Sequence, residues 1–372
     1  MVKANKPKIL VVGSHPNSSF SMTNFTRDNF AVLTELESSF DLIFFTPLKV
    51  FSRITPQLLP KKYSVNIDKF AIFAPFLAIF LMFKQVQIVH VLDQSDSIYR
   101  LFIRSKCRFV VTVHDIFALQ AASGHLPEIV KSKSGIAFAR LIELGLRKSD
   151  LALAISHTTE KDLKERFGEL SSRVIHNFVR EVNFELTKFD KSDSSNTFLI
   201  VMSSNWRKDR IASLRVWTKL LSIPEFQSSD LTVVGNQLTN DELFLIPERF
   251  ISRIHVRGNL TSIEIAELYR KSIAVINISK YEGFGLQIIE ANLNGKICIY
   301  GGSAALREIG GHLNVNWDEI KADIKTSNLS DRILSYDKRV SAYEAVIRNF
   351  SAQQYVRKIY VAYSSILSLL EE

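Results

Sequence analysis

The sequence predicts an α/β fold made of two domains, each built around a parallel β-sheet. At 372 residues the chain is too long for one ordinary hydrophobic core. Short, continuously apolar runs that are typical of buried strands alternate with segments of helical periodicity. This alternation begins again after a polar, serine-rich segment at residues 188–196, which is therefore the best candidate for an interdomain linker.

The first half begins as a Rossmann-like domain does. Residues 8–13 form an apolar run closed by glycine, residues 23–36 have helical spacing, and residues 41–46 are again apolar. Further strands are predicted at 86–92, 109–114 and 151–155. Ligands bind beyond the carboxyl ends of parallel strands, so the loop from Gly13 to Ser21 should line a cleft.

One segment of this half is unusually apolar. The 14 residues from Phe70 to Phe83 are too few to span a bilayer, which takes about 20 residues. We expect a core helix of the first domain. The alternative is a helix at a membrane surface, because lysines flank the segment at positions 61, 62, 69 and 84.

The positive charge is concentrated in the first half. The formal net charge is +9, and residues 1–190 hold 25 Lys and Arg against 18 Asp and Glu. Such a surface attracts anionic lipid headgroups, nucleic acid or a phosphorylated acceptor, although ordinary solvated surface explains it equally well. Nucleic acid is the least favoured partner, since no run of five basic residues and no aromatic–basic RNA-binding motif occurs.

The cysteines and the first residues bear on location. Cys107 and Cys298 lie far apart in apolar surroundings, which argues against a disulfide framework or a zinc site and fits a reducing cytoplasm. No apolar h-region of a signal peptide follows the charged residues 1–8, so we expect no signal peptide and a cytoplasmic protein.

The second half repeats the alternation, with strands predicted at 198–202, 231–235, 254–258, 274–278 and 296–300. Arg207 and Lys208 follow the first of these strands, before a helix. A purely structural role for them is disfavoured, because two cations at a helix start oppose the helix dipole.

The most informative stretch runs from Ala274 to Glu290. An apolar run is followed by a glycine-containing loop and a helix that should end at Asn294-Gly295. Backbone N–H groups at a helix N-terminus can hold an anion. Glu282 and Glu290 bracket the loop. A phosphate cradle between two carboxylates predicts a ligand with a diphosphate and several hydroxyls, which is a nucleotide sugar.

Glu282 and Glu290, with Gly283-Phe284-Gly285-Leu286 after the first, resemble the E-x7-E signature of retaining glycosyltransferases of the GT-B fold, glycosyltransferase family four. The resemblance implies two Rossmann-like domains facing each other across a cleft. Residues 1–187 would bind the acceptor, 188–197 would link the domains, and 198–349 would bind the nucleotide sugar. Residues 350–372 would form a helix that crosses back to the first domain.

The resemblance also implies roles for three catalytic residues. Glu282 would contact the transferred sugar, and Lys208 would meet the diphosphate. His114, at the end of a first-domain strand, would contact the donor sugar. The alternative for His114 is a strand-end histidine satisfied by Asp115 or by a backbone carbonyl.

Eight further residues are implied in donor binding. Glu290 would accept hydrogen bonds from the ribose hydroxyls, and Arg207 would assist Lys208. The backbone near the ends of two strands, at Gly235 and Arg257, would hold the nucleobase. Backbone N–H groups of the loop would bind the sugar and the diphosphate; they belong to Gly283, Phe284, Gly285 and Leu286.

The resemblance predicts a retaining, metal-independent hexosyltransferase without a cofactor, which takes a nucleotide-diphosphate sugar and a glycan or lipid-linked acceptor in surface polysaccharide or lipopolysaccharide biosynthesis. No D-x-D metal motif occurs in the sequence. Peripheral contact with an anionic membrane, at the inner face of the cytoplasmic membrane, remains open.

Departures from the family pattern leave alternatives. Ser203-Ser204 stand where relatives often carry an arginine, and Gln287 stands where many carry proline. These departures leave a non-catalytic nucleotide-sugar binder as one alternative. The other two are a nucleotide-sugar epimerase or phosphorylase of the same fold and a nucleic-acid binder.

Overall fold

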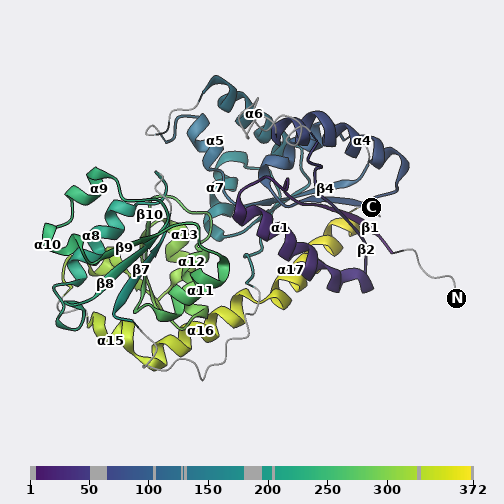
Figure 1. The fold of residues 1–372 in the computed structure, drawn as a ribbon. Helices are drawn as coiled ribbons and strands as arrows, with labels where there is room; N and C mark the ends of the chain where they lie inside the picture. The colour runs from purple at the N-terminus through teal and green to yellow at the C-terminus, as the bar shows by residue number, and fades with distance from the viewer. Residues whose placement is uncertain are drawn as a thin grey trace. The chain divides into compact units, whose positions relative to one another are not determined.

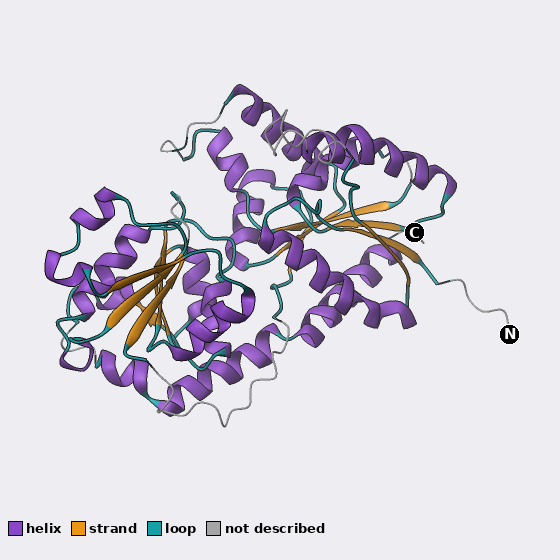
Figure 2. Ribbon diagram, viewed as in Figure 1, coloured by secondary structure: helices purple, strands orange, loops and turns teal. Residues whose placement is uncertain are grey.

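The computed structural model describes residues 6–50, 65–103, 106–126, 129, 132–179, 195–202, 206–324 and 328–369. The chain forms two compact units, Met1–Phe178 with Ala352–Glu372, and Val179–Ser351. Each unit is a six-stranded parallel sheet with helices on both faces (Figure 1, Figure 2). The predicted α/β fold class, with two Rossmann-like sheets, is confirmed.

The first unit has the strand order β2-β1-β3-β4-β5-β6. The side chains of β1 alternate between the two faces, since Leu10 and Val12 lie in one core cluster and Ile9 and Val11 in the other. Both faces are apolar because helices cover both. The strands are β1 (Lys8–Val12), β2 (Asp41–Phe45), β3 (Ile88–Val91), β4 (Arg108–Val113), β5 (Leu151–Ala154) and β6 (Ser172–Val174).

Serine side chains start three helices of this unit. The hydroxyls of Ser19, Ser132 and Ser156 accept hydrogen bonds from first-turn N–H groups of α1, α6 and α7. The helices and short 3-10 segments are α1 (Phe20–Leu33), η1 (Thr34–Ser38), η3 (Gln94–Leu101), α5 (Phe117–Ala122), α6 (Lys133–Arg147) and α7 (His157–Phe167).

The apolar segment forms a π-helix, η2 (Ile67–Phe73), that continues into α4 (Ala74–Phe83). Leu77 and Leu81 are buried in the core, as expected of a core helix. The opposite face is exposed, so the core prediction holds for one side of the helix only. Across the part of the chain that the structure describes, no helix has the length and apolar character needed to cross a bilayer.

Lys69 does not flank this segment as a surface cation, and that expectation is wrong. Its side chain is buried, and its Nζ lies 2.5 Å from Oδ1 of the buried Asp96. Burial opposes the charged form of Lys69, but the carboxylates of Asp96 and Asp93 outweigh it and raise the pKa of the lysine. The ammonium is therefore committed to an internal ion pair.

The C-terminal helix α17 (Ala352–Ser368) belongs to the first unit. The Tyr355 hydroxyl lies 2.5 Å from Asn29 Oδ1, and the Tyr363 hydroxyl lies 2.7 Å from Nδ1 of the buried His90. Burial lowers the pKa of His90 to about 3, so its ring is neutral. These polar contacts between buried groups fix the position of α17 against α1 and β3.

The two units meet in sequence earlier than the predicted boundary at residue 187. The Val179 N–H donates to the Phe350 carbonyl at 3.0 Å, and Val179 forms a parallel bridge with Ser351. Residue 179 therefore already belongs to the second unit. Most of the predicted linker, 188–197, lies outside the described residues.

The second unit has the strand order β12-β11-β10-β7-β8-β9. Its strands are parallel and largely buried, so their carboxyl ends lie along one edge. The strands are β7 (Thr197–Val201), β8 (Asp230–Val234), β9 (Ile254–Arg257), β10 (Val275–Ser279), β11 (Cys298–Gly302) and β12 (Val315–Asn316).

Helices cover both faces of this second sheet (Figure 2). The polar stretch before residue 350, which carried no helix prediction, forms α15 and α16. The helical elements are α8 (Arg210–Leu220), η6 (Pro224–Phe226), α9 (Asn240–Phe244), α10 (Glu248–Ile251), α11 (Ser262–Lys271), α12 (Leu286–Leu293), α13 (Ala304–Gly310), α14 (Trp317–Ile320), α15 (Leu329–Leu334) and α16 (Tyr336–Phe350).

Candidate active site

Two loops at the carboxyl edge of the second sheet are joined through their backbones. The Lys280 N–H, after β10, donates to the Arg207 carbonyl at 2.8 Å, and the Asp209 N–H donates to the Ile278 carbonyl at 3.1 Å. Lys208 itself forms an antiparallel bridge with Ser279. The two sequence motifs, whose Lys208 and Glu282 are 74 positions apart in the chain, therefore form one site.

Lys208 and Glu282 form an ion pair in this site. The Lys208 ammonium donates a hydrogen bond to Glu282 Oε1, and the two side chains are 21% and 15% exposed. The Glu282 backbone N–H donates to Ser303 Oγ at 3.1 Å, which fixes the start of the loop. The pair is shielded from bulk water but still reachable, so a ligand anion can replace the carboxylate beside the ammonium.

The helix start beside this pair carries no side-chain cap. Gly285 is the N-cap residue of α12, and no side chain of the described residues caps the helix. Its φ of 132° lies in the region that favours glycine, and an added Cβ would lie 3.1 Å from Leu306 Cδ2. The partial positive charge of this helix end is available to an anion.

Two of the loop residues differ in exposure. The Phe284 side chain is buried, and its ring packs edge-on against Phe350 with 5.6 Å between centroids. Leu286 is exposed. Phe284 therefore anchors the loop through its side chain. The predicted donor contacts of Gly283 to Leu286 involve their backbone N–H groups instead.

Glu290 lies one turn further along α12. Its Oε2 accepts a hydrogen bond from the Tyr269 hydroxyl at 2.8 Å. Burial raises the pKa of Glu290, and the Tyr269 bond and the charge of Lys208 lower it by less. Sequence reasoning missed Tyr269, because nothing in the helical pattern of α11 distinguishes it from an ordinary core residue.

Gly235 and Arg257 end two neighbouring strands. The Gly235 N–H donates to the Arg257 carbonyl at 2.8 Å, and Gly235 has a φ of 148°. The Arg257 side chain is exposed. The structure thus joins the two strand ends that were predicted to hold the nucleobase.

Arg210 holds the loop that follows Gly235. It is 2% exposed, and its guanidinium makes two hydrogen bonds, at 2.6 and 2.5 Å, with the Glu242 carboxylate. It also donates to the carbonyls of Asn236 and Gln237, at 2.8 and 3.1 Å. Burial tends to raise the pKa of Glu242, but the bonds from Arg210 and Thr239 hold it below its usual range.

One departure from the family pattern has a visible contact. The Gln287 side-chain amide donates to the Val201 carbonyl at the end of β7. A proline cannot make this bond, so Gln287 ties the start of α12 to the strand that precedes Lys208 in the chain. Ser203 and Ser204 lie outside the described residues.

His114 lies in the first unit, directly after β4. Its Nε2 is 3.0 Å from the Leu92 carbonyl, so Nε2 carries a proton and donates it to that oxygen. The ring packs edge-on against Phe25 with centroids 4.6 Å apart. Of the two partners considered from the sequence, the structure gives His114 the backbone carbonyl.

A cavity of about 510 Å³ lies beside the strand ends of the first unit, a size typical of small-ligand pockets. Its described lining combines polar side chains with an apolar wall. The lining residues are Gln94, Ser95, Asp115, Ile116, Ala118, Leu119, Ser132, Gly135, Phe138, Ala139 and Ile142.

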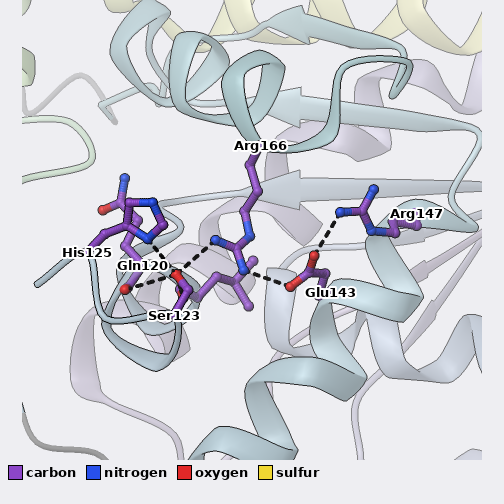
Figure 3. A network of polar contacts seen from close by, with 7 residues as sticks. Gln120, Ser123, His125, Glu143, Arg147 and Arg166 are labelled. Carbon is purple, nitrogen blue, oxygen red and sulfur yellow. Dashed lines mark hydrogen bonds and ion pairs between the residues drawn. The ribbon is translucent and has the colours of Figure 1, made fainter.

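A polar network lies beside a second cavity of the first unit, of about 360 Å³. Figure 3 shows Arg166 between Ser123 and Glu143, to which it donates at 3.1 and 2.7 Å. Arg147 donates to the other oxygen of Glu143 at 2.8 Å. Burial tends to raise the pKa of Glu143, but the two guanidinium groups hold it below its usual range. The network fixes the end of α5 against α6 and α7.

Curated and solved proteins resemble this chain over most of its length. It is 23% identical over 269 residues to the N-acetyl-alpha-D-glucosaminyl L-malate synthase of Bacillus anthracis, covering 65% of this chain and 67% of that protein. Its fold is similar to that of sucrose-phosphate synthase from Thermosynechococcus elongatus, with a TM-score of 0.67, 14% identity and 98% and 100% of the two chains covered.

Two further solved structures are similar. The lipopolysaccharide outer core galactosyltransferase WaaB has a TM-score of 0.65 and 15% identity, with 96% of this chain and 99% of that chain covered. HepE of Anabaena, solved in complex with UDP and glucose, has a TM-score of 0.61 and 16% identity, with 96% and 100% covered.

Two family descriptions match consecutive parts of the chain. Residues 49–181 match Glycosyltransferase Family 4, and residues 182–325 match Glycosyl transferases group 1. Together the two matches cover most of the sequence, and the resemblance carried by Glu282 and Glu290 is confirmed. The chain belongs to glycosyltransferase family 4 and is a glycosyltransferase of the GT-B fold.

Proposed function

We propose that this glycosyltransferase moves a hexose from a nucleotide-diphosphate sugar to a hydroxyl of a glycan or lipid-linked acceptor, with retention of configuration and without a metal. One observation carries the donor assignment: Lys208, Glu282 and Glu290 lie together beside the uncapped start of α12. A nucleotide sugar offers a matching diphosphate, ribose and hexose.

Lys208 and the start of α12 would bind the diphosphate. On binding, a phosphate oxygen would replace Glu282 as the partner of the ammonium. Each charge-assisted hydrogen bond contributes about 1.5–3 kcal/mol. Because the leaving diphosphate gains negative charge in the transition state, fixed positive charge at this position lowers the barrier.

The two glutamates would bind the hydroxyl-bearing parts of the donor. Glu282, released from Lys208, would accept hydrogen bonds from the transferred hexose. Glu290 would accept from the ribose. The strand ends at Gly235 and Arg257, held by the Arg210 network, would bind the nucleobase.

Retention follows from a same-face reaction. The acceptor hydroxyl attacks the anomeric carbon on the side that the diphosphate leaves, the carbon–phosphate oxygen bond breaks, and the leaving phosphate oxygen takes the hydroxyl proton. This route needs no protein nucleophile. NMR of the product should show the anomeric configuration of the donor, with full turnover in EDTA; an inverted product or loss of turnover would refute this part.

The relatives support a nucleotide-hexose donor and a glycan acceptor. HepE was solved with UDP and glucose, and WaaB is a lipopolysaccharide galactosyltransferase. Release of nucleoside diphosphate from UDP- and GDP-hexoses tests the reaction. Release that rises with added acceptor identifies transfer, conversion of the donor sugar without acceptor identifies an epimerase, and binding without turnover identifies a non-catalytic binder.

A face of α4 supports membrane contact of the first unit. Phe76, Ile79, Met82 and Phe83 are between 50% and 80% exposed, and their spacing places them on one side of the helix. Lys84 is exposed at the helix end. An apolar stripe that ends beside an exposed lysine fits an anionic bilayer surface, where a lipid-linked acceptor would be found.

We expect Met82→Ser with Phe83→Ser to reduce co-sedimentation with phosphatidylglycerol vesicles at least tenfold, because burial of exposed apolar area contributes roughly 25 cal/mol per Å². A matched control is Phe244→Ser with Ile263→Ser, which removes 90% and 82% exposed side chains from the second unit. Equal vesicle binding by wild type and the α4 variant would end the membrane proposal.

A further inference from the structure

Tyr269 contacts the carboxylate of Glu290. Its ring lies on α11, is 1% exposed, and belongs to a core cluster with Val275, Cys298 and Leu306. Its hydroxyl donates to Glu290 Oε2 at 2.8 Å. A tightly packed ring holds the hydroxyl at a fixed point, and a buried phenol needs such an acceptor.

We propose that Tyr269 is a positioning residue for ribose recognition: it occupies Oε2 of Glu290 and thereby aims Oε1 at the ribose hydroxyls of the donor. The proposal rests on the donor site proposed above. Within the described residues, no other side chain is hydrogen-bonded to this carboxylate. One oxygen is thus held by the protein, and the other is left for the ligand.

The alternative, in which Tyr269 only fills space in the core, predicts that nucleotide binding does not depend on the phenolic hydroxyl. Phenylalanine would keep the ring packing and remove only the hydrogen bond. Under the proposal, loss of the hydrogen bond frees the Glu290 side chain to rotate. The carboxylate, which is fixed in wild type, must then be ordered when the donor binds. Ribose binding weakens while the core stays intact.

The charged and titratable groups near Glu290 give the proposal a pH dependence. Lys208, paired with Glu282, faces it from the loop before α8, and Cys298 of β11 lies beside Tyr269. Burial raises the pKa of Glu290, and the Tyr269 bond and Lys208 lower it. Removing the hydroxyl therefore raises the pKa of Glu290 further. As the pH falls, the Glu290 carboxylate of the variant is protonated before that of wild type and no longer offers a charged acceptor.

The test is calorimetric titration of wild type and Tyr269→Phe with UDP and GDP, and with the 2′-deoxy and 3′-deoxy form of whichever binds better. We expect the variant to bind the ribonucleotide about tenfold more weakly, the usual effect of one hydrogen bond to a charged group. The gap should widen as the pH is lowered. Preference for ribo- over deoxynucleotide should shrink, and KM for the donor should rise more than kcat falls.

Tyr363→Phe is the matched control, because it removes a buried tyrosine hydroxyl from the first unit. It should leave nucleotide affinity unchanged. If Tyr269→Phe does not fold, Glu290→Gln replaces it and should lose the ribose preference at unchanged melting temperature.

The outcomes separate this proposal from the proposed function. A Tyr269→Phe protein with wild-type affinity, ribose preference and pH profile overturns the positioning role, as does a Glu290→Gln protein that keeps its ribose preference. A wild-type protein that binds no nucleoside diphosphate overturns the donor site itself.

Discussion

Lys208→Ala should lower kcat/KM at least 100-fold and weaken nucleoside diphosphate binding at least tenfold. The lysine supplies the side-chain charge beside the predicted diphosphate position, and loss of one group that stabilises transition-state charge costs about 2.7–4 kcal/mol. The substitution also leaves Glu282, which is 15% exposed, without its ammonium. Titration with UDP and GDP measures the affinity, and donor turnover measures the rate.

A neighbouring lysine provides the control. Lys280 is exposed, and its ammonium lies 5.6 Å from the ring centre of Trp206 rather than beside Glu282. Lys280→Ala changes the net charge of the same edge equally and should alter donor affinity less than threefold, because exposed charges are screened. A Lys208→Ala protein with full donor affinity would remove Lys208 from the site.

Arg210→Met should reduce the free energy of unfolding of the second unit by about 3–5 kcal/mol, the usual cost of removing one partner of a buried ion pair. Glu242 would keep its burial without the guanidinium, and the carbonyls of Asn236 and Gln237 would lose their donor. The three tryptophans, Trp206, Trp217 and Trp317, all lie in this unit, so their fluorescence follows its unfolding in urea.

The double variant Arg210→Met with Glu242→Gln separates the charge from the packing. Glutamine keeps an acceptor for the Thr239 N–H, which now bonds to Glu242 at 2.8 Å. Since no buried charge is left unpaired, we expect the double variant to recover at least half of the lost stability. A single variant within about 1 kcal/mol of wild type would show that Glu242 is solvated, contrary to this account.

The sequence was informative where the signal is local. The apolar runs predict β1 and β2 to within one residue, and the helix predicted to end at Asn294-Gly295 is α12, which ends at Leu293. The family resemblance assigned Lys208 and Glu282 to one donor site, and both follow parallel strands, whose carboxyl ends share an edge.

The supporting residues could not be found in the same way. Tyr269 is 21 positions from Glu290, and Arg210 is 32 positions from Glu242. Each pair joins two helices. Helical periodicity indicates which face of a helix is buried, but not which polar group of another helix bonds to a side chain on that face. Lys69 was misread for the same reason, since its partner Asp96 is 27 residues away.

The α4 helix illustrates a second limit. Its sequence is apolar on every side, so the sequence does not indicate which face of the helix is exposed. The structure buries Leu77 and Leu81 and exposes Met82 and Phe83, a division that depends on which side packs on the sheet.

Turnover by Glu282→Ala tests the central claim most directly. With a UDP- or GDP-hexose and acceptor, the account predicts acceptor-dependent release of nucleoside diphosphate by wild type and at least 100-fold slower release by the variant. The variant should keep its fold, shown by an unchanged melting temperature of the second unit, which contains Glu282, and by stabilisation with nucleotide, which amounts to about 2.7 kcal/mol at a hundredfold excess over Kd. A folded Glu282→Ala protein that turns over at the wild-type rate would contradict the account.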